Sequence, residues 1–248
     1  MSLPIGLQLW SIKDETEKDF VGTLKKVAEI GYQGVEFAGY GGLTSEELNA
    51  TLNELGLKAC GSHVPLDHIL ENLDEVIRFN LEIGNKYIIC PYASFESKDD
   101  FLSLANKLKE ASEKCKAHGL VVGYHNHNHE FVKYDQQFGL DIILDNTPAN
   151  FISELDVYWV QYAGINTVEY IAKHSGRFEL IHIKDMEIVN GEKRSTEIGN
   201  GIINMKPIIE AAEAQGAKWL VIEQEFFTKP CLESVKEGFN YLNKVFNG

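Results

Sequence analysis

Short, strongly apolar runs alternate along the chain with longer stretches whose apolar residues recur every three or four positions. The short runs are typical of buried strands in a parallel sheet, and the longer stretches are typical of amphipathic helices. The predicted strands are Ile5–Trp10, Gly34–Phe37, Lys58–His63, Tyr87–Cys90, Val121–His125, Phe151–Leu155, Leu180–Ile183 and Trp219–Ile222. The clearest predicted helices are Thr16–Ile30, Ser45–Leu55, Asp67–Ile83, Lys98–Ala117 and Leu232–Phe246. This alternation predicts an α/β fold, a closed (β/α)8 TIM barrel.

The residues between these predicted strands and helices support the same fold. Gly31, Gly56, Gly84 and Gly119 each follow a predicted helix, where a residue with positive φ closes the last turn. Segments 127–138 and 185–204 lack periodicity, and we interpret them as long loops at the carboxyl ends of the strands. A chain of 248 residues suits one barrel, so we expect a single TIM-barrel domain over residues 1–248.

Composition excludes several classes of partner. A net charge of -14 repels polyanions, so we expect no nucleic-acid partner. Only three arginines are present, so bidentate phosphate clamps are scarce and a neutral or weakly acidic sugar fits better. No apolar run approaches the roughly 18 residues of a membrane span, and no signal sequence is recognisable. We therefore expect a cytoplasmic protein with no membrane partner; whether it forms a homo-oligomer stays open.

Polar residues collect where the predicted strands end, and in a parallel barrel these ends converge on one mouth. The residues are Trp10, Glu36, His63, His125, His127, Glu130, Asp156, His182, Lys184, Asp185 and Glu223. A single strand-end histidine such as His63 is more often a hydrogen-bonded scaffold residue. Carboxylates and histidines at four consecutive strand ends, however, suit one divalent ion of Mn, Mg, Co, Fe or Zn. Several buried carboxylates would be costly without such a cation.

Five segments carry a resemblance to a known family: GYHNHNHEF (123–131), ELDVYWVQYAG (154–164), LIHIKD (180–185), EIGNGIINMKPII (197–209) and VIEQE (221–225). In order and spacing the chain resembles, over essentially its whole length, the sugar phosphate isomerase/epimerase group of the xylose-isomerase-like TIM barrel superfamily. The resemblance implies a metal-dependent isomerase or epimerase acting on a small sugar-like or polyol-derived substrate.

The resemblance also implies the metal ligands. Asp156, His182 and Glu223 match the family's ligands on strands six to eight. The fifth strand departs from the pattern, because strict register puts His125 where the family has a glutamate, while the nearest carboxylate is Glu130. Either residue fits as the first ligand, and we favour Glu130. The departure weakens the case for the family's two-glutamate epimerase mechanism.

For catalysis, proton abstraction next to a carbonyl needs a base, for which Glu223, His125, His127 and Lys184 are the candidates. Expected substrate contacts are Trp10, Glu36, His63, Trp159, Asp185 and Glu197. The YHNH stretch also resembles inosose dehydratases, so a keto-sugar dehydratase or lyase that uses the same metal is the main alternative. A sugar-binding barrel without catalysis is the remaining one.

Overall fold

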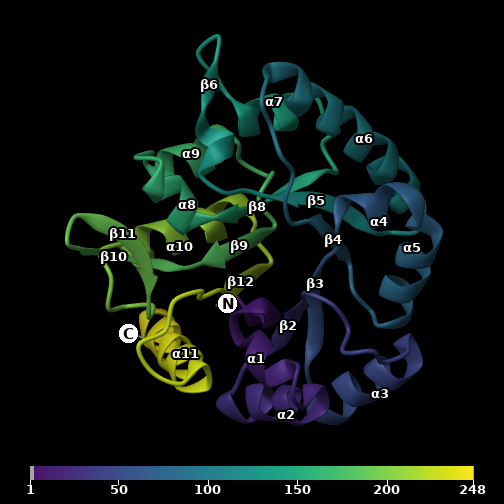
Figure 1. Ribbon diagram of the computed structural model, residues 1–248, viewed down its shortest axis with the longest axis vertical. Coiled ribbons are helices and arrows are strands. Elements are labelled where there is room, and N and C mark those ends of the chain that lie inside the picture. Colours follow the sequence, from purple (N-terminus) through teal and green to yellow (C-terminus); the bar gives the residue numbers. More distant parts are fainter. Residues whose placement is uncertain (1–2, 248) are drawn as a thin grey trace.

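The computed structural model describes residues 3–247, and within them eight parallel strands close into a barrel. The strands are β1 (Ile5–Gln8), β2 (Gly34–Phe37), β3 (Lys58–His63), β4 (Tyr87–Cys90), β5 (Val121–His125), β8 (Ile152–Asp156), β9 (Leu180–Ile183) and β12 (Trp219–Ile222). Each pairs with the next along the chain, and β12 pairs with β1 to close the ring. The predicted TIM barrel is confirmed, with the strands at the centre of Figure 1.

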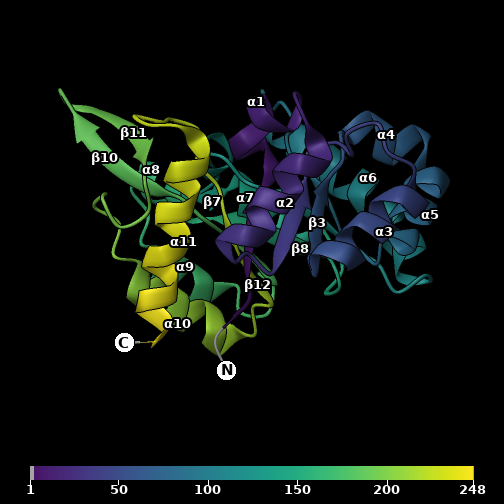
Figure 2. The ribbon, with the colours of Figure 1, turned by 90° about the horizontal axis from the view of Figure 1, so that it is seen from below.

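Helices surround the strands, as Figures 1 and 2 show from two directions. They are α2 (Phe20–Ile30), α3 (Ser45–Leu55), α4 (Leu66–Glu71), α5 (Leu73–Glu82), α6 (Lys98–Lys116), α7 (Gly139–Asp145), α8 (Val157–Tyr162), α9 (Thr167–Lys173), α10 (Met205–Gln215) and α11 (Cys231–Asn247), with short helices η1 (Leu9–Ile12), α1 (Lys13–Thr16) and η2 (His129–Phe131) near the mouth. Gly31, Gly56, Gly84 and Gly119 all have positive φ just past a helix, as predicted.

The structure corrects three predicted boundaries. The first strand ends at Gln8 rather than Trp10, because the chain turns there into η1. The helix predicted from Thr16 begins at Phe20, since the Asp19 carboxylate accepts the N–H of Gly22 and caps a new helix. The helix predicted over Asp67–Ile83 is broken into α4 and α5 at Asn72, whose φ of -127° and ψ of 29° are not helical.

Two segments predicted as irregular loops contain hairpins. Strands β6 (Lys133–Tyr134) and β7 (Gln137–Phe138) pair around a turn with positive φ at Asp135 and Gln136. Strands β10 (Asp185–Val189) and β11 (Glu192–Thr196) form a longer hairpin, which projects from the barrel in Figure 2. Positive φ at both central residues is the geometry that suits the twist of a tight hairpin.

The interior of the barrel is layered. Side chains two residues apart on a strand face the same way, so Val121 shares the inward face of β5 with His125. Val121 packs in a buried apolar cluster with Tyr87, Ile89, Ile152 and Leu180. This cluster closes the amino end of the barrel interior, and polar side chains occupy the carboxyl end.

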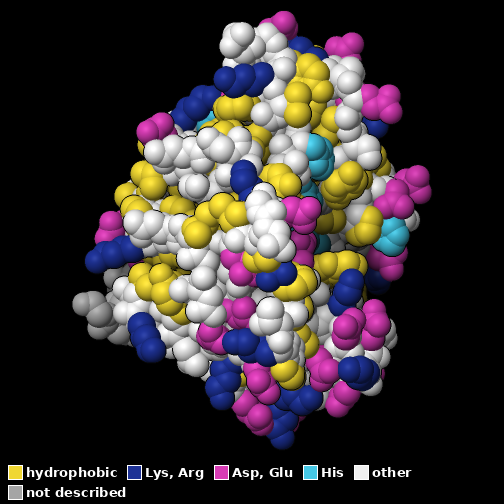
Figure 3. Space-filling view, turned by 60° about the vertical axis from the view of Figure 1, so that its left-hand side comes forward, with side chains coloured by type: hydrophobic (Ala, Val, Ile, Leu, Met, Phe, Trp, Pro, Cys, Tyr) yellow, Lys and Arg dark blue, Asp and Glu magenta, His cyan; other side chains and the backbone are white. Residues whose placement is uncertain are grey.

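The molecular surface fits the composition. Lys and Arg side chains are scattered among Asp and Glu on the face in Figure 3. Of the helices within residues 3–247, none is long and apolar enough to cross a membrane.

Candidate metal centre and active site

Four side chains with metal-ligating atoms meet at the carboxyl ends of β5, β8, β9 and β12. They are His125, Asp156, His182 and Glu223, and one ligand atom of each lies within 4.8 Å of the others. Asp156 pairs with His182 in the register of β8 and β9, so the two side chains point to the same face of the sheet. All four residues are buried. We call them the mouth cluster.

A second polar layer lies deeper in the barrel. Glu154 precedes Asp156 by two residues on β8 and therefore faces the same way, one layer further in. Its Oε2 is 2.7 Å from His63 Nε2 and 3.2 Å from both His125 Nδ1 and His182 Nε2. His63, His125, Glu154 and His182 consequently form a second group with ligating atoms in close reach of one another.

His182 joins the two layers through its two ring nitrogens. Its Nδ1 lies 3.2 Å from Glu223 Oε2 at the mouth, whereas its Nε2 lies 2.6 Å from Glu36 Oε2 in the interior. The same oxygen of Glu36 accepts a hydrogen bond from Gln8 Nε2 at 2.8 Å. A side chain on Gly61 would collide with Glu36, since its Cβ would fall 2.2 Å from Oε1. Glycine at 61 is thus what makes room for this buried carboxylate.

The buried carboxylates and histidines of these two layers shift one another's pKa values. Burial would lower the pKa of His182, but Glu154 and Glu36 outweigh it and raise that pKa well above its usual value. Burial would raise the pKa of Glu154, yet His182 and His63 hold it well below its usual value. The pKa of Glu36 is raised to about 7 by burial and by the charge of Glu154. His182 is thus the group whose positive charge the surrounding carboxylates favour.

The donor set of the mouth cluster fits a divalent cation. Asp156 Oδ1 accepts the N–H of Trp159 at 3.1 Å and caps α8, while its buried Oδ2 has no hydrogen-bond partner among residues 3–247. Burial raises the pKa of Asp156 to about 7 and lowers the pKa of His125 to about 4. The raised pKa of Asp156 marks a buried negative charge that a bound cation would compensate, and a neutral imidazole is the form of histidine that binds a metal.

Lys184 is a buried cation beside the mouth cluster. Its Nζ lies 2.6 Å from Glu225 Oε2, 4.0 Å from Glu223 Oε2 and 5.0 Å from the ring centroids of both Tyr158 and Trp159. Burial would lower its pKa, but Glu223 and other acidic neighbours outweigh burial and raise it. The geometry therefore favours a fixed positive charge for Lys184 over the role of a base.

Glu130, favoured from sequence as the first metal ligand, lies in a different group, with His127 and His129. Its carboxylate accepts the Tyr124 hydroxyl at 2.5 Å and the backbone N–H of His127 at 2.8 Å, and its Oε1 lies 3.1 Å from His129 Nε2. The chain turns into η2 after β5, and this turn carries Glu130 away from β8 and β9. The structure brings His125, not Glu130, to Asp156, His182 and Glu223.

Two of the expected substrate contacts hold loops together instead of lining the cavity. The Asp185 carboxylate accepts the backbone N–H groups of Met186, Gly199, Gly201 and Ile203 at 2.8 to 3.1 Å. Glu197 is buried and accepts the Ser234 hydroxyl at 2.8 Å, which ties the loop after β11 to α11. This geometry gives no support to their predicted contact with substrate.

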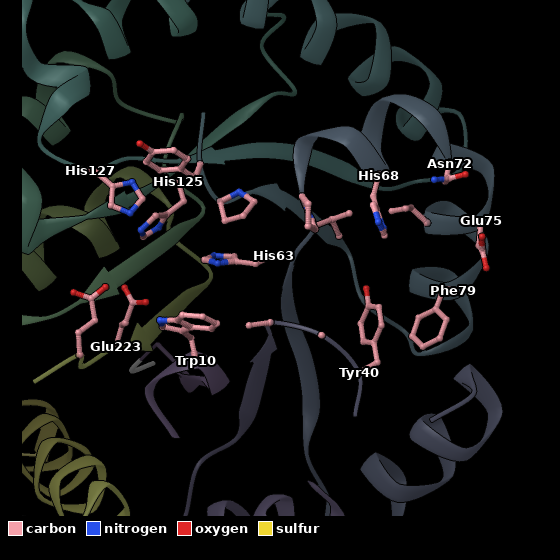
Figure 4. A pocket seen from close by; sticks show the side chains of 18 residues that line it. Trp10, Tyr40, His63, His68, Asn72, Glu75, Phe79, His125, His127 and Glu223 are labelled. Atoms are coloured by element: carbon pink, nitrogen blue, oxygen red, sulfur yellow. The ribbon is translucent and has the colours of Figure 1, made fainter. Parts of the chain in front are cut away.

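A cavity of about 910 Å³ opens at the mouth. Of the residues expected from sequence, Trp10, His63, His125, His127 and Glu223 line it, and Figure 4 shows them grouped around one end. Trp10 and Tyr92 are about half exposed at its edge. Trp159 stands behind His127, with 5.5 Å between the ring centroids.

Sequence reasoning missed Glu154 and the far part of the cavity. Glu154 has a recognisable signal, because it lies two residues before Asp156 and so on the same strand face. The far part is lined by residues of α4, α5 and the loops after β2 and β3, such as Tyr40 and Phe79. Local sequence gives no sign that these segments stand away from the barrel and enclose space.

Known proteins share the barrel of this chain. The family model of the xylose isomerase-like TIM barrel matches residues 24–245. An inosose dehydratase of Geobacillus kaustophilus is 23% identical over 244 residues, which cover 82% of this chain and 79% of that protein. The crystal structure of a sugar phosphate isomerase/epimerase from Parabacteroides distasonis superposes with a TM-score of 0.85 and 27% identity over 98% of each chain. The crystal structure of IOLI protein with a binding zinc atom superposes with a TM-score of 0.79 and 14% identity, again over 98% of each chain.

Proposed function

The chain belongs to the xylose isomerase-like TIM barrel family, and on this premise we propose that it is a divalent-metal-dependent sugar isomerase or epimerase. The observation that carries the proposal is the mouth cluster, in which a buried carboxylate oxygen of Asp156 has no partner among the described residues. Two imidazoles and two carboxylates suit zinc, manganese, iron or cobalt. The zinc of the IOLI structure supports the same assignment.

His125, Asp156, His182 and Glu223 would hold the ion. When bound, it would stabilise the negative charge that develops on the carbonyl oxygen during proton abstraction. The positive charge of Lys184, buried behind Glu223 and Glu225, adds to the same field.

His127 is the base that the geometry favours. It lines the cavity, and its buried Nδ1 has no hydrogen-bond partner among residues 3–247. Burial is the main cause that lowers its pKa to about 2, so the ring is neutral at pH 7. A neutral imidazole is the form that accepts a proton, but a pKa of about 2 makes it a weak base, so proton abstraction by His127 would depend on the bound ion acidifying the substrate carbon.

The substrate is a neutral sugar or keto-sugar. None of the described residues that line the cavity is lysine or arginine, whereas Glu75, Glu223 and Glu225 do line it. A phosphate group would meet carboxylates there without the cationic clamp that recognises it. Trp10 and Tyr92 offer the flat apolar faces against which a sugar ring packs.

A keto-sugar dehydratase is the second candidate, and one observation favours it. His125 occupies the strand-five position and Glu130 points elsewhere, so the mouth cluster holds one glutamate rather than two. A single base suits loss of a β-hydroxyl better than exchange of a proton between two faces. The 23% identity to an inosose dehydratase agrees with this alternative.

Metal content and proton exchange test the proposal together. We expect about one divalent ion per chain in the purified protein, lost in Asp156→Ala and in His182→Ala. We also expect solvent deuterium to enter a substrate carbon in a panel of ketoses and keto-sugars, with loss of one water by mass marking the dehydratase. A wild-type protein without stoichiometric metal after incubation with each of these ions would refute the proposal.

A further inference from the structure

The cavity extends well beyond the mouth cluster. Its volume of about 910 Å³ is near the upper end of the roughly 300–1,000 Å³ of pockets that hold drug-sized ligands. A single sugar ring is a small ligand on that scale. Figure 4 shows lining side chains in two groups, with His125, His127 and Glu223 on one side and Tyr40 and Phe79 on the other. Space remains for a second part of the substrate.

The far group forms what we call the apolar lobe, defined by Tyr40, Val64, Pro65, Val76 and Phe79. Tyr40 comes from the loop after β2, Val64 and Pro65 from the loop after β3, and the other two from α5. His63, which ends β3, lines the same cavity between this lobe and the mouth cluster (Figure 4). The lobe and the mouth cluster are therefore parts of one binding site.

The lobe has a preformed aromatic wall. The rings of Tyr40 and Phe79 stack with 4.1 Å between centroids and 27° between planes. Phe37 packs against Tyr40 from the barrel side at 5.5 Å, and Asn80 Nδ2 donates to the Tyr40 hydroxyl at 3.3 Å. Because these contacts fix the rings before any ligand arrives, little entropy is lost when a flat group packs on them.

Polar side chains line only the outer end of the lobe, where His68, Asn72 and Glu75 are exposed. A second sugar ring would bring hydroxyls against the hydrocarbon of Val64, Pro65 and Val76, where most would lose hydrogen bonds to water without replacement. An aromatic ring loses none there, and polar substituents at its far edge would reach the exposed end.

We propose that the substrate is an aromatic glycoside of a keto-sugar, whose sugar, with its ring ketone, lies at the mouth cluster and whose aromatic aglycone lies in the apolar lobe. This inference rests on the proposed function for the sugar end and names the substrate class of the same site. It also explains the size of the cavity, which a free monosaccharide leaves largely empty.

Calorimetric titration with three probes tests the proposal: phenyl β-D-glucopyranoside, methyl β-D-glucopyranoside and cellobiose. Burying a phenyl ring on a preformed wall is expected to tighten binding by about tenfold or more over the methyl compound. Val76→Trp fills the lobe from α5 and should remove this advantage, so that the phenyl and methyl compounds bind with similar affinity. Val76→Phe fills the lobe with a smaller side chain and replaces the tryptophan variant if that variant does not fold.

Leu81→Trp is the matched control, because Leu81 lies on the same helix, is 44% exposed and is not among the residues that line the cavity. It should keep the preference for the phenyl compound. Equal affinity for phenyl and methyl glucosides in the wild type, or a phenyl preference that survives both Val76 variants, would overturn the proposal. Cellobiose binding as tightly as the phenyl compound would also overturn it, in favour of a second sugar. The metal measurement is independent, so a protein without metal that still prefers the phenyl compound refutes only the proposed function.

Discussion

His182 Nε2 lies 2.6 Å from the buried Oε2 of Glu36, while the other nitrogen of the same ring faces the mouth cluster. A carboxylate on the far nitrogen of a metal-binding histidine fixes its tautomer and ring orientation and increases its basicity. Glu36 was expected from sequence to touch substrate. Its full burial and its contact with His182 point away from substrate contact, and we propose instead that it positions His182 for the metal.

Glu36→Gln should therefore weaken metal binding without abolishing it. Loss of such a partner typically costs roughly 10–100-fold in metal affinity, so we expect the dissociation constant to rise in that range while saturating metal restores full occupancy. Competition with a chromophoric chelator measures it. Glu130→Gln serves as the control, and an unchanged dissociation constant in Glu36→Gln would show that Glu36 does not act through His182.

A comparison of His125 and Glu130 decides the strand-five ligand. We expect His125→Ala to lose stoichiometric metal, because His125 belongs to the mouth cluster, and Glu130→Gln to retain it. Glu130→Gln should instead lower the melting temperature by a few degrees, since its carboxylate accepts the Tyr124 hydroxyl and the His127 N–H. Metal analysis with thermal unfolding measures both. The opposite pattern would restore the ligand assignment that the sequence favoured.

The strand-end residues and Glu130 show which parts of the site can be predicted from the sequence. The convergence of strand ends in a barrel is enough to bring Asp156, His182 and Glu223 together, because each lies at or next to the end of a regular strand. Glu130 lies five residues past β5, where the path of the chain depends on the turn into η2. Periodicity describes strands and helices but does not describe such turns.

The sequence also does not predict how deep a side chain lies in the barrel or where a cavity forms. The eight strands were predicted to within two residues at either end, since apolar runs bounded by glycine and polar residues are a local signal. Which of Glu154 and Asp156 reaches the mouth depends on the height of β8 relative to β9, which the register of the closed barrel sets. The apolar lobe depends on the break at Asn72 that separates α4 from α5, a tertiary feature without a sequence pattern.

His127→Asn should separate catalysis from metal binding. We expect metal content to stay at about one per chain, because His127 is outside the mouth cluster, and deuterium exchange to fall by about 10²–10⁴-fold with the loss of the base. The pKa of His127 lies at about 2, so its protonation should cause no loss of wild-type activity between pH 7 and 5. Exchange at the wild-type rate in His127→Asn would assign the base elsewhere.

The buried carboxylate of Asp141, which pairs with the half-exposed Lys173, predicts how stability changes in acid. Asp141 Oδ2 lies 2.6 Å from Lys173 Nζ, and its Oδ1 lies 2.7 Å from His174 Nε2 and accepts the Tyr170 hydroxyl at 2.8 Å. Burial would raise the pKa of Asp141, but His174, Lys173 and Tyr170 outweigh it and lower the pKa to about 2. Because the folded-state pKa lies below the unfolded value, the charged carboxylate stabilises the fold above about pH 4. That contribution is lost as the pH falls from about 4 through about 2.

Asp141→Asn should thus reduce the free energy of unfolding at pH 7 by about 1–3 kcal/mol, the usual cost of removing hydrogen bonds to a charged group. The gap between wild type and variant should persist at pH 5 and narrow only below about pH 4, because only there does the wild type begin to lose the same charge. Urea unfolding of both proteins at pH 7, 5, 4 and 3 measures the gap, with Asp67→Asn at an exposed position as the control. A gap that has already closed at pH 5 would mean that Asp141 titrates near its ordinary value and that its three partners do not hold it ionised.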